Sequence, residues 1–92
     1  DAHFDLRGGA TPSSGTPFRQ IADLAHQRGW SFRYAVYGIS EYANTAALFH
    51  RARALEVRFR LDESLTLLDR EAARRELADF VAGVEHVYLT FC

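Results

Sequence analysis

The chain has 92 residues, the size of one domain, so we expect a single domain over residues 1–92. Its 11 lysine and arginine residues against 12 aspartate and glutamate residues give a formal net charge of −1, which makes nucleic-acid binding unexpected. The single cysteine, Cys92, excludes an intramolecular disulfide and a cysteine-built metal site, and it favours a reduced, cytoplasmic setting.

The first half of the chain predicts a strand, a helix and a second strand. Ala2–Gly8 alternates apolar with polar residues, as a strand does. Thr16 and Pro17 suit the cap and the first position of a helix, and apolar residues then recur at helical spacing, which predicts a helix over residues 17–28. Ser31–Gly38 is aromatic and β-branched and predicts the second strand.

The second half contains one ambiguous stretch and three predicted elements. Ser40–Ala52 fits either a helix or a loop that leaves the sheet and returns. Leu55–Leu61 alternates strictly between apolar and charged or polar residues and predicts a strand. Asp69 suits the cap of a helix over residues 70–82, and His86–Phe91 predicts a last strand.

With Ser40–Ala52 taken as a connector, the predicted order is strand, helix, strand, strand, helix, strand. This order predicts an α+β fold, the ferredoxin-like βαββαβ sandwich. Its four-stranded antiparallel sheet would carry two helices on one face and leave the other face bare.

A short pattern of residues runs through the middle of the chain: GTPF at Gly15–Phe18, then Gly29, Gly38, Ile39 and Tyr42. In these features the chain resembles the PII-like signalling proteins, in particular their uncharacterised PII-like branch. The resemblance implies trimers that hold nucleotide-like effectors between subunits, and a partner-contacting loop at Gly38–Ala54. The chain departs from the pattern at Ala43, where that family has glycine.

The resemblance places His50, Arg51 and Arg53 near the base of this loop. Their hydrogen-bond donors suit an anionic group, because arginine can bind a phosphate or carboxylate through two N–H groups. With Gly38 and Tyr42 they are the predicted ligand-binding residues. The alternative is that the basic residues bind no ligand and only form the end of an ordinary helix, where they interact favourably with its dipole. The expected function is a small oligomeric regulatory module that binds an anionic effector or a protein partner.

A rival resemblance is to barstar-like interaction and inhibitor modules. It would make Ser40–Ala52 a second helix and Ser31–Gly38 a loop. The acidic partner-binding helix expected of that family is missing, because Glu41 is the only carboxylate in the stretch.

The predicted bare sheet face carries basic and aromatic side chains: Tyr37, Arg58, Arg60 and Tyr88. We expect this face to be the interface of a homo-oligomer, a dimer or a trimer. An RNA-binding sheet is the alternative, but the aromatic RNP pattern is absent.

Catalysis is less expected than binding, with a small ferredoxin-like dimeric enzyme as the alternative. His3, His26, His50 and His86 are scattered without metal-ligand spacing, and no nucleophile elbow is present. We therefore expect no catalytic residues, no metal and no cofactor.

The sequence predicts no membrane contact. No apolar run approaches the roughly 18 residues of a membrane span, and no signal-peptide pattern is present. The first residue is Asp1 rather than methionine, which indicates a trimmed chain or an excised domain.

Overall fold

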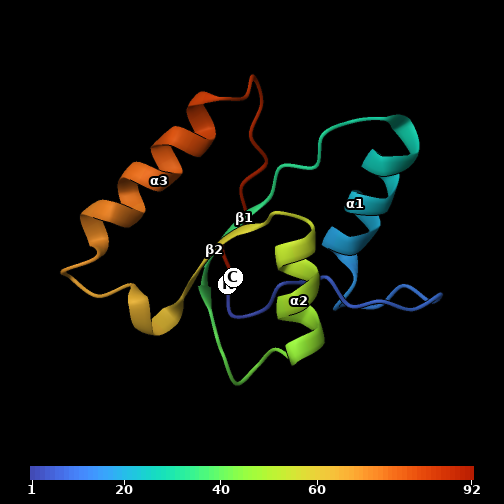
Figure 1. Cartoon of the computed structure of the whole chain (residues 1–92), viewed down its shortest axis with the longest axis horizontal. Helices are drawn as coiled ribbons and strands as arrows, with labels where there is room; N and C mark the ends of the chain where they lie inside the picture. The colour runs from blue at the N-terminus through green and yellow to red at the C-terminus, as the bar shows by residue number, and fades with distance from the viewer.

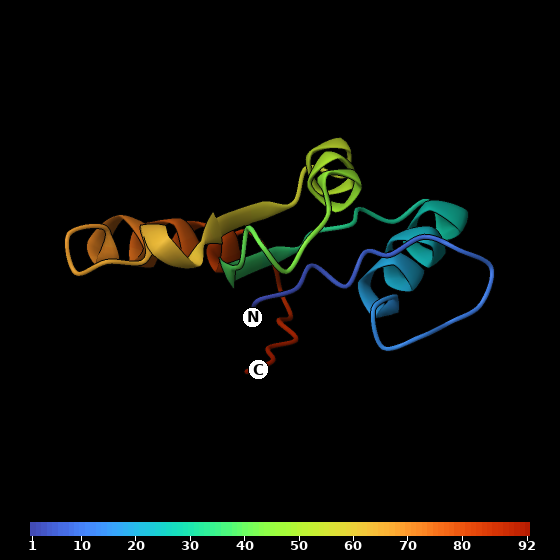
Figure 2. The same ribbon diagram turned by 90° about the horizontal axis from the view of Figure 1, so that it is seen from below.

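The computed structural model describes all 92 residues and contains three α-helices, two strands and one short 3₁₀ helix (Figure 1). In chain order the elements are α1 (Pro17–Arg28), β1 (Ala35–Ile39), α2 (Ala46–Ala54), β2 (Arg58–Leu61), η1 (Asp62–Ser64) and α3 (Arg70–Ala82). α1 and α3 lie on opposite sides of the strands, and the two chain ends lie close together (Figures 1 and 2). No helix combines the length and the apolar character needed to span a membrane.

β1 and β2 form a two-stranded parallel sheet, with Val36 paired to Phe59. α2 lies on one face of this sheet and carries the chain back to the end where β1 began (Figure 2). Parallel neighbours require such a crossover, whereas antiparallel neighbours can be joined by a hairpin. The predicted ferredoxin-like βαββαβ sandwich and its four-stranded antiparallel sheet are therefore wrong.

The bounds of α1 and α3 agree with their predicted ranges, although neither Thr16 nor Asp69 makes a side-chain capping hydrogen bond. α1 starts with Pro17 and stops at Gly29, whose φ of 69° is the left-handed conformation that glycine adopts easily. α3 matches its predicted range of residues 70–82. The ambiguity of Ser40–Ala52 is resolved by Thr45, whose hydroxyl accepts a hydrogen bond from the Leu48 N–H at 3.3 Å and so caps α2.

Two predicted strands are not formed. Ala2–Gly8 is interrupted at Asp5, whose φ of 56° is left-handed and breaks an extended ladder. His86–Phe91 is exposed and makes no backbone hydrogen bond, because no neighbouring strand lies along it. The predicted strand Leu55–Leu61 forms only from Arg58 onward, because Glu56 also has a left-handed φ of 56°.

The core lies between α2, the sheet and the first residues of the chain: Phe4, Leu6, Val36, Ile39, Ala52 and Val57. The Phe4 ring meets the rings of Phe49 and Phe59 edge-on, with centroids 5.1 Å apart in each pair. This geometry suits the ring quadrupoles, and it fixes the first residues against the sheet. The apolar side of the Ala2–Gly8 alternation is therefore buried as expected, although no strand forms there.

Candidate functional site

The first seven residues, called here the N-terminal segment, cross the carboxyl end of β1. The α-amino nitrogen of Asp1 donates to the Tyr37 carbonyl at 2.7 Å, and the Ser40 N–H donates to the Ala2 carbonyl at 3.1 Å. Ligands of open parallel sheets bind outside the carboxyl ends of the strands. The N-terminal segment therefore occupies the place where a functional site is expected in this kind of sheet.

Buried Asn44 holds the N-terminal segment in position. Its Nδ2 group donates to the carbonyls of Ala2 at 2.7 Å and Ser40 at 2.8 Å, and its Oδ1 atom accepts from the Phe4 N–H at 3.2 Å. From the other side, the Tyr34 hydroxyl donates to the Phe4 carbonyl at 3.2 Å. The segment is thus tied to both the loop before α2 and the sheet.

Polar side chains alternate along the N-terminal segment at Asp1, His3 and Asp5, while Phe4 packs into the core. Burial raises the pKa of the Asp5 carboxyl, and the nearby His3 opposes this shift electrostatically. Asp1 accepts a hydrogen bond from the His3 N–H at 3.0 Å through Oδ1. Two carboxyl groups and an imidazole therefore share a short stretch, and one of them takes up a proton more readily than usual.

Carboxylate and imidazole are also ligand types of divalent cations. No three histidine, cysteine, aspartate or glutamate side chains come together in the structure in a way that could hold a metal ion. The segment therefore supplies suitable donor atoms without forming a complete metal site within these 92 residues.

Gly38, a predicted ligand-binding residue, marks the point where β1 meets the N-terminal segment. Its φ is 93°, and the sheet register shifts between Tyr37 and Ile39. A Cβ atom at this position would lie 3.4 Å from the Asp1 nitrogen. Glycine is therefore needed for backbone conformation and contributes to the close approach of Asp1.

The structure spreads the other predicted ligand-binding residues along α2 and the loop before it. Arg51 Nη1 donates to the Leu6 carbonyl at 2.6 Å, so of the two predicted arginines only Arg51 binds the N-terminal segment. Arg53 lies over the Phe49 ring at 5.7 Å from its centroid. His50 is exposed, and Tyr42 is 98% exposed. Their joint role as a ligand site stays a prediction.

Three of the four predicted interface residues hold α3 against the sheet. Arg60 binds both carboxylate oxygens of Glu76, at 2.9 and 2.7 Å, and the Tyr37 hydroxyl donates to the same carboxylate at 3.1 Å. Arg58 donates to the Glu76 backbone carbonyl at 2.8 Å. Tyr88 instead lies exposed on the C-terminal stretch.

This arrangement shifts two pKa values. The hydrogen bonds from Arg60 lower the pKa of Glu76 to about 2. Burial, together with the hydrogen bond to Glu76, raises the pKa of Tyr37 to about 12. Both groups therefore keep one charge state across the neutral range, which suits a structural tie better than proton transfer.

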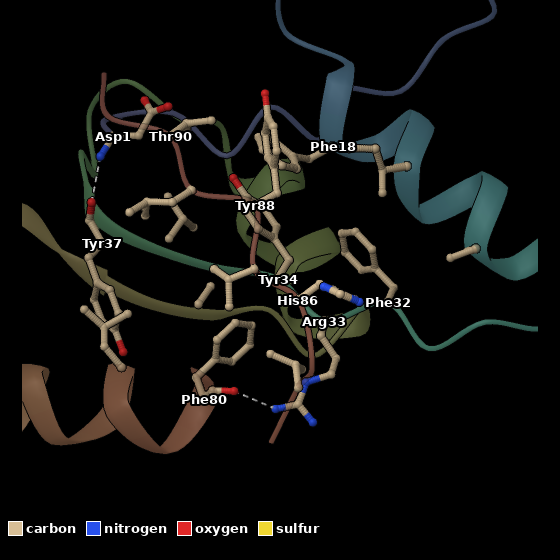
Figure 3. A pocket seen from close by; sticks show the side chains of 18 of the residues that line it. Asp1, Phe18, Phe32, Arg33, Tyr34, Tyr37, Phe80, His86, Tyr88 and Thr90 are labelled. Atoms are coloured by element: carbon tan, nitrogen blue, oxygen red, sulfur yellow. Dashed lines mark hydrogen bonds between the residues drawn. The ribbon is translucent and has the colours of Figure 1, made fainter. Parts of the chain in front are cut away.

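A cavity of about 680 Å³ lies beside the same sheet, bounded by α1, α3 and the C-terminal stretch (Figure 3). Apolar side chains dominate its wall, and the aromatic ones include Phe18, Phe32 and Tyr88. Arg33 lines it too, but its guanidinium donates to the Phe80 carbonyl at 3.2 Å. Its wall offers apolar surface rather than a converging set of catalytic groups.

Comparison with known proteins identifies the family of this chain. The sequence profile of the arginase family matches residues 1–92. The chain belongs to the arginase family. It is 58% identical over 92 residues to the formimidoylglutamases of Aromatoleum aromaticum and Ralstonia nicotianae, and 48% identical over 90 residues to that of Rhodococcus opacus. These matches cover 100%, 100% and 98% of this chain but only 27%, 28% and 28% of the relatives.

Membership of the arginase family corrects the resemblances drawn from the sequence. The PII-like assignment and its barstar-like rival are both wrong, and so is the expected regulatory module that binds an effector or partner through residues 38–54. The two alternatives, a ferredoxin-like enzyme and an RNA-binding sheet, are also wrong. The pattern of glycines between Gly15 and Tyr42 is shared by many helix–strand units, so it could not distinguish one family from another.

Sequence reasoning missed the polar side chains of the N-terminal segment as a group. The signal was present, because Asp1, His3 and Asp5 place ligand or proton-transfer groups at every second residue. The alternation in Ala2–Gly8 also predicts the solvent-exposed side of a strand, which is how it is interpreted above. The histidines alone show no metal-ligand spacing; the signal lies in His3 together with the neighbouring carboxylates Asp1 and Asp5.

Proposed function

We propose that this chain is part of an arginase-family hydrolase that acts on formimidoylglutamate. The observation that carries the proposal is the 58% identity, across all 92 residues, to two proteins named formimidoylglutamase. The chain spans about a quarter of the length of those relatives, so it would contribute one part of the enzyme. The position of the N-terminal segment at the carboxyl end of β1 supports a role for that part in the active site.

The chemistry of the substrate defines what the active site must do. A formimidoyl group on the nitrogen of glutamate is an amidine, and water must add to its central carbon. The bond from that carbon to the glutamate nitrogen then breaks, and the leaving nitrogen takes up a proton. The site therefore needs one group that accepts the proton of water and one that returns a proton to the leaving nitrogen.

Asp1, His3 and Asp5 are the candidates within this chain for activating the attacking water. Partial burial raises the pKa of the Asp5 carboxyl. His3 is exposed and close enough to influence Asp5 electrostatically.

The donor types of Asp1, His3 and Asp5 also fit a divalent cation. These residues would hold the ion together with ligands from the part of the polypeptide outside these 92 residues. A cation bound there would make the attacking water more acidic.

The test compares two variants of the polypeptide that extends this chain to the length of its relatives. Asp5→Asn should lower kcat for formimidoylglutamate about 100-fold or more, because it removes a charged donor for the cation that would activate the water. Asp79→Asn is the matched control, because Asp79 is exposed on α3 and should leave kcat unchanged. Elemental analysis of both proteins measures bound metal, with loss expected only in Asp5→Asn. Equal activity in the two variants would exclude Asp5 from the reaction.

Two expectations remain part of this proposal: homo-oligomer formation and a cytoplasmic setting. The expected oligomer interface is the predicted set Tyr37, Arg58, Arg60 and Tyr88, of which Tyr88 is exposed. The expected cytoplasmic setting rests on the presence of a single cysteine, Cys92. Sedimentation at two concentrations tests the first expectation, and a single monomeric species at both would contradict it.

A further inference from the structure

A second groove, called here the arginine groove, lies between α1 and α2 where Gly8 passes them. Its volume is about 530 Å³, and its polar lining includes Arg19, His26 and Arg51. Unlike the apolar cavity beside the sheet, it is lined mostly by polar and small residues. It therefore suits a small polar ligand.

Arg51 carries the unpaired charge of the arginine groove. Its side chain is half-buried and forms no ion pair with any carboxylate in the structure. One of its five N–H groups is used, in the bond from Nη1 to the Leu6 carbonyl at 2.6 Å. This bond fixes the guanidinium while most of its donors stay free for a ligand.

Gly8 makes room for that guanidinium. A Cβ atom at Gly8 would lie 2.8 Å from both Nη1 and Nη2 of Arg51, so it would push the guanidinium out of its present position. The absence of a side chain at this position therefore lets Arg51 lie against the backbone just after the N-terminal segment.

Arg19 forms the opposite wall and is already compensated. Its Nη1 atom pairs with Asp23 at 2.8 Å, and its Nε atom donates to the Arg7 carbonyl at 3.1 Å. With that pair neutral overall, the groove has one free positive charge, at Arg51. It should therefore take a single anionic group, and His26 offers a further polar contact at the rim.

We infer that the arginine groove binds a carboxylate of the glutamate portion of the substrate, with Arg51 as the binding residue. The groove lies next to the backbone that follows Asp5, because the carbonyls that hold Arg51 and Arg19 belong to Leu6 and Arg7. A guanidinium grips a carboxylate through two parallel hydrogen bonds. The identity of the carboxylate rests on the proposed function; the presence of an anion site at Arg51 does not.

The test measures KM and kcat for formimidoylglutamate in the polypeptide of full relative length. Arg51→Gln should raise KM about 10- to 100-fold, the effect of losing a charged hydrogen-bonded contact, with kcat changed less than about threefold. Arg51→Lys keeps the positive charge but loses the paired N–H donors of the guanidinium. Its KM should therefore lie between those of the wild type and Arg51→Gln. Arg75→Gln is the matched control, an exposed arginine on α3. Unchanged KM in both Arg51 variants would overturn the inference.

Binding of glutarate and of inorganic phosphate separates this inference from the proposed function. Calorimetry on the wild-type chain should detect glutarate, and Arg51→Gln should weaken its binding by the same factor as the KM change. If formimidoylglutamate is not hydrolysed but glutarate binding depends on Arg51, the proposed function fails and the carboxylate site stands. Binding of phosphate but not of glutarate would overturn the carboxylate assignment. If Arg51→Gln fails to fold, Arg51→Lys and Gly8→Ala, which displaces the guanidinium, must both weaken glutarate binding.

Discussion

Replacement of Asn44 by alanine should loosen the N-terminal segment from the rest of the fold. Asn44 is the only side chain that binds the segment through both its donor and its acceptor, and it is 9% exposed. Its removal leaves the N–H of fully buried Phe4 without a partner, at a cost of about 1–3 kcal/mol. The two carbonyls that lose a donor add about 0.5–1.5 kcal/mol each.

The expected loss for Asn44→Ala is about 2–4 kcal/mol, in the lower half of the summed range. The Ala2 carbonyl keeps its bond from the Ser40 N–H, and water can reach the half-buried ends of the network. Such a loss is a large share of the roughly 5–15 kcal/mol that stabilises a typical domain. Urea unfolding followed by circular dichroism measures it as a lower midpoint at constant slope.

The matched control for this experiment is Gln27→Ala, on the exposed surface of α1. Gln27 makes no side-chain hydrogen bond, so its replacement should change the unfolding free energy by less than about 0.5 kcal/mol. A change of this small size for Asn44→Ala would refute the view that Asn44 anchors the N-terminal segment.

Two further predictions concern the ion pair that joins the sheet to α3 and the glycine in β1. The lowered pKa of Glu76 means that its ion pair with Arg60 stabilises the fold above the unfolded pKa near 4.5, and that this contribution is lost as the pH falls towards about 2. Glu76→Gln should therefore flatten the pH dependence of stability between about pH 4.5 and 2, and an unchanged slope would contradict this. Gly38→Ala should cost about 1–2 kcal/mol in thermal or urea unfolding, because its φ of 93° lies in the left-handed region. Gly29→Ala, at the end of α1 with nothing near its Cβ, separates backbone strain from the contact with Asp1.

The helices could be predicted from the sequence because their signals are local. Pro17 and Gly29 bound α1, and the apolar stripe after Asp69 gave α3 its range. The cap at Thr45 is equally local, but the sequence of Ser40–Ala52 fits both a helix and a loop. Once that stretch is a helix, the order strand, helix, strand requires a crossover and favours a parallel pair.

Strand pairing could not be predicted because it depends on partners distant in the sequence. His86–Phe91 has the alternation of a strand but no neighbour that binds its backbone. The reverse holds for Ala2–Gly8, where the apolar positions are buried although Asp5 breaks the strand. Alternation thus identified which side faces the core, but not whether a ladder forms.

The candidate site was only partly accessible to sequence reasoning. Arg51 could be predicted as a ligand-binding residue from the basic residues around it. Its contact with Leu6, 45 positions away, is seen only in the structure. The proximity of Asp1 to Tyr37 likewise comes from the fold. The polar residues of the N-terminal segment, by contrast, were visible in the sequence and were attributed to a solvated strand face.

The most direct test of the central claim is the release of glutamate from formimidoylglutamate. The polypeptide that extends this chain to the length of its relatives should release glutamate from formimidoylglutamate and should release much less urea from arginine, because both named relatives at 58% identity are formimidoylglutamases. Hydrolysis of arginine without release of glutamate would contradict the proposed substrate while leaving the family assignment intact. Hydrolysis of neither compound would contradict the proposed function as a whole.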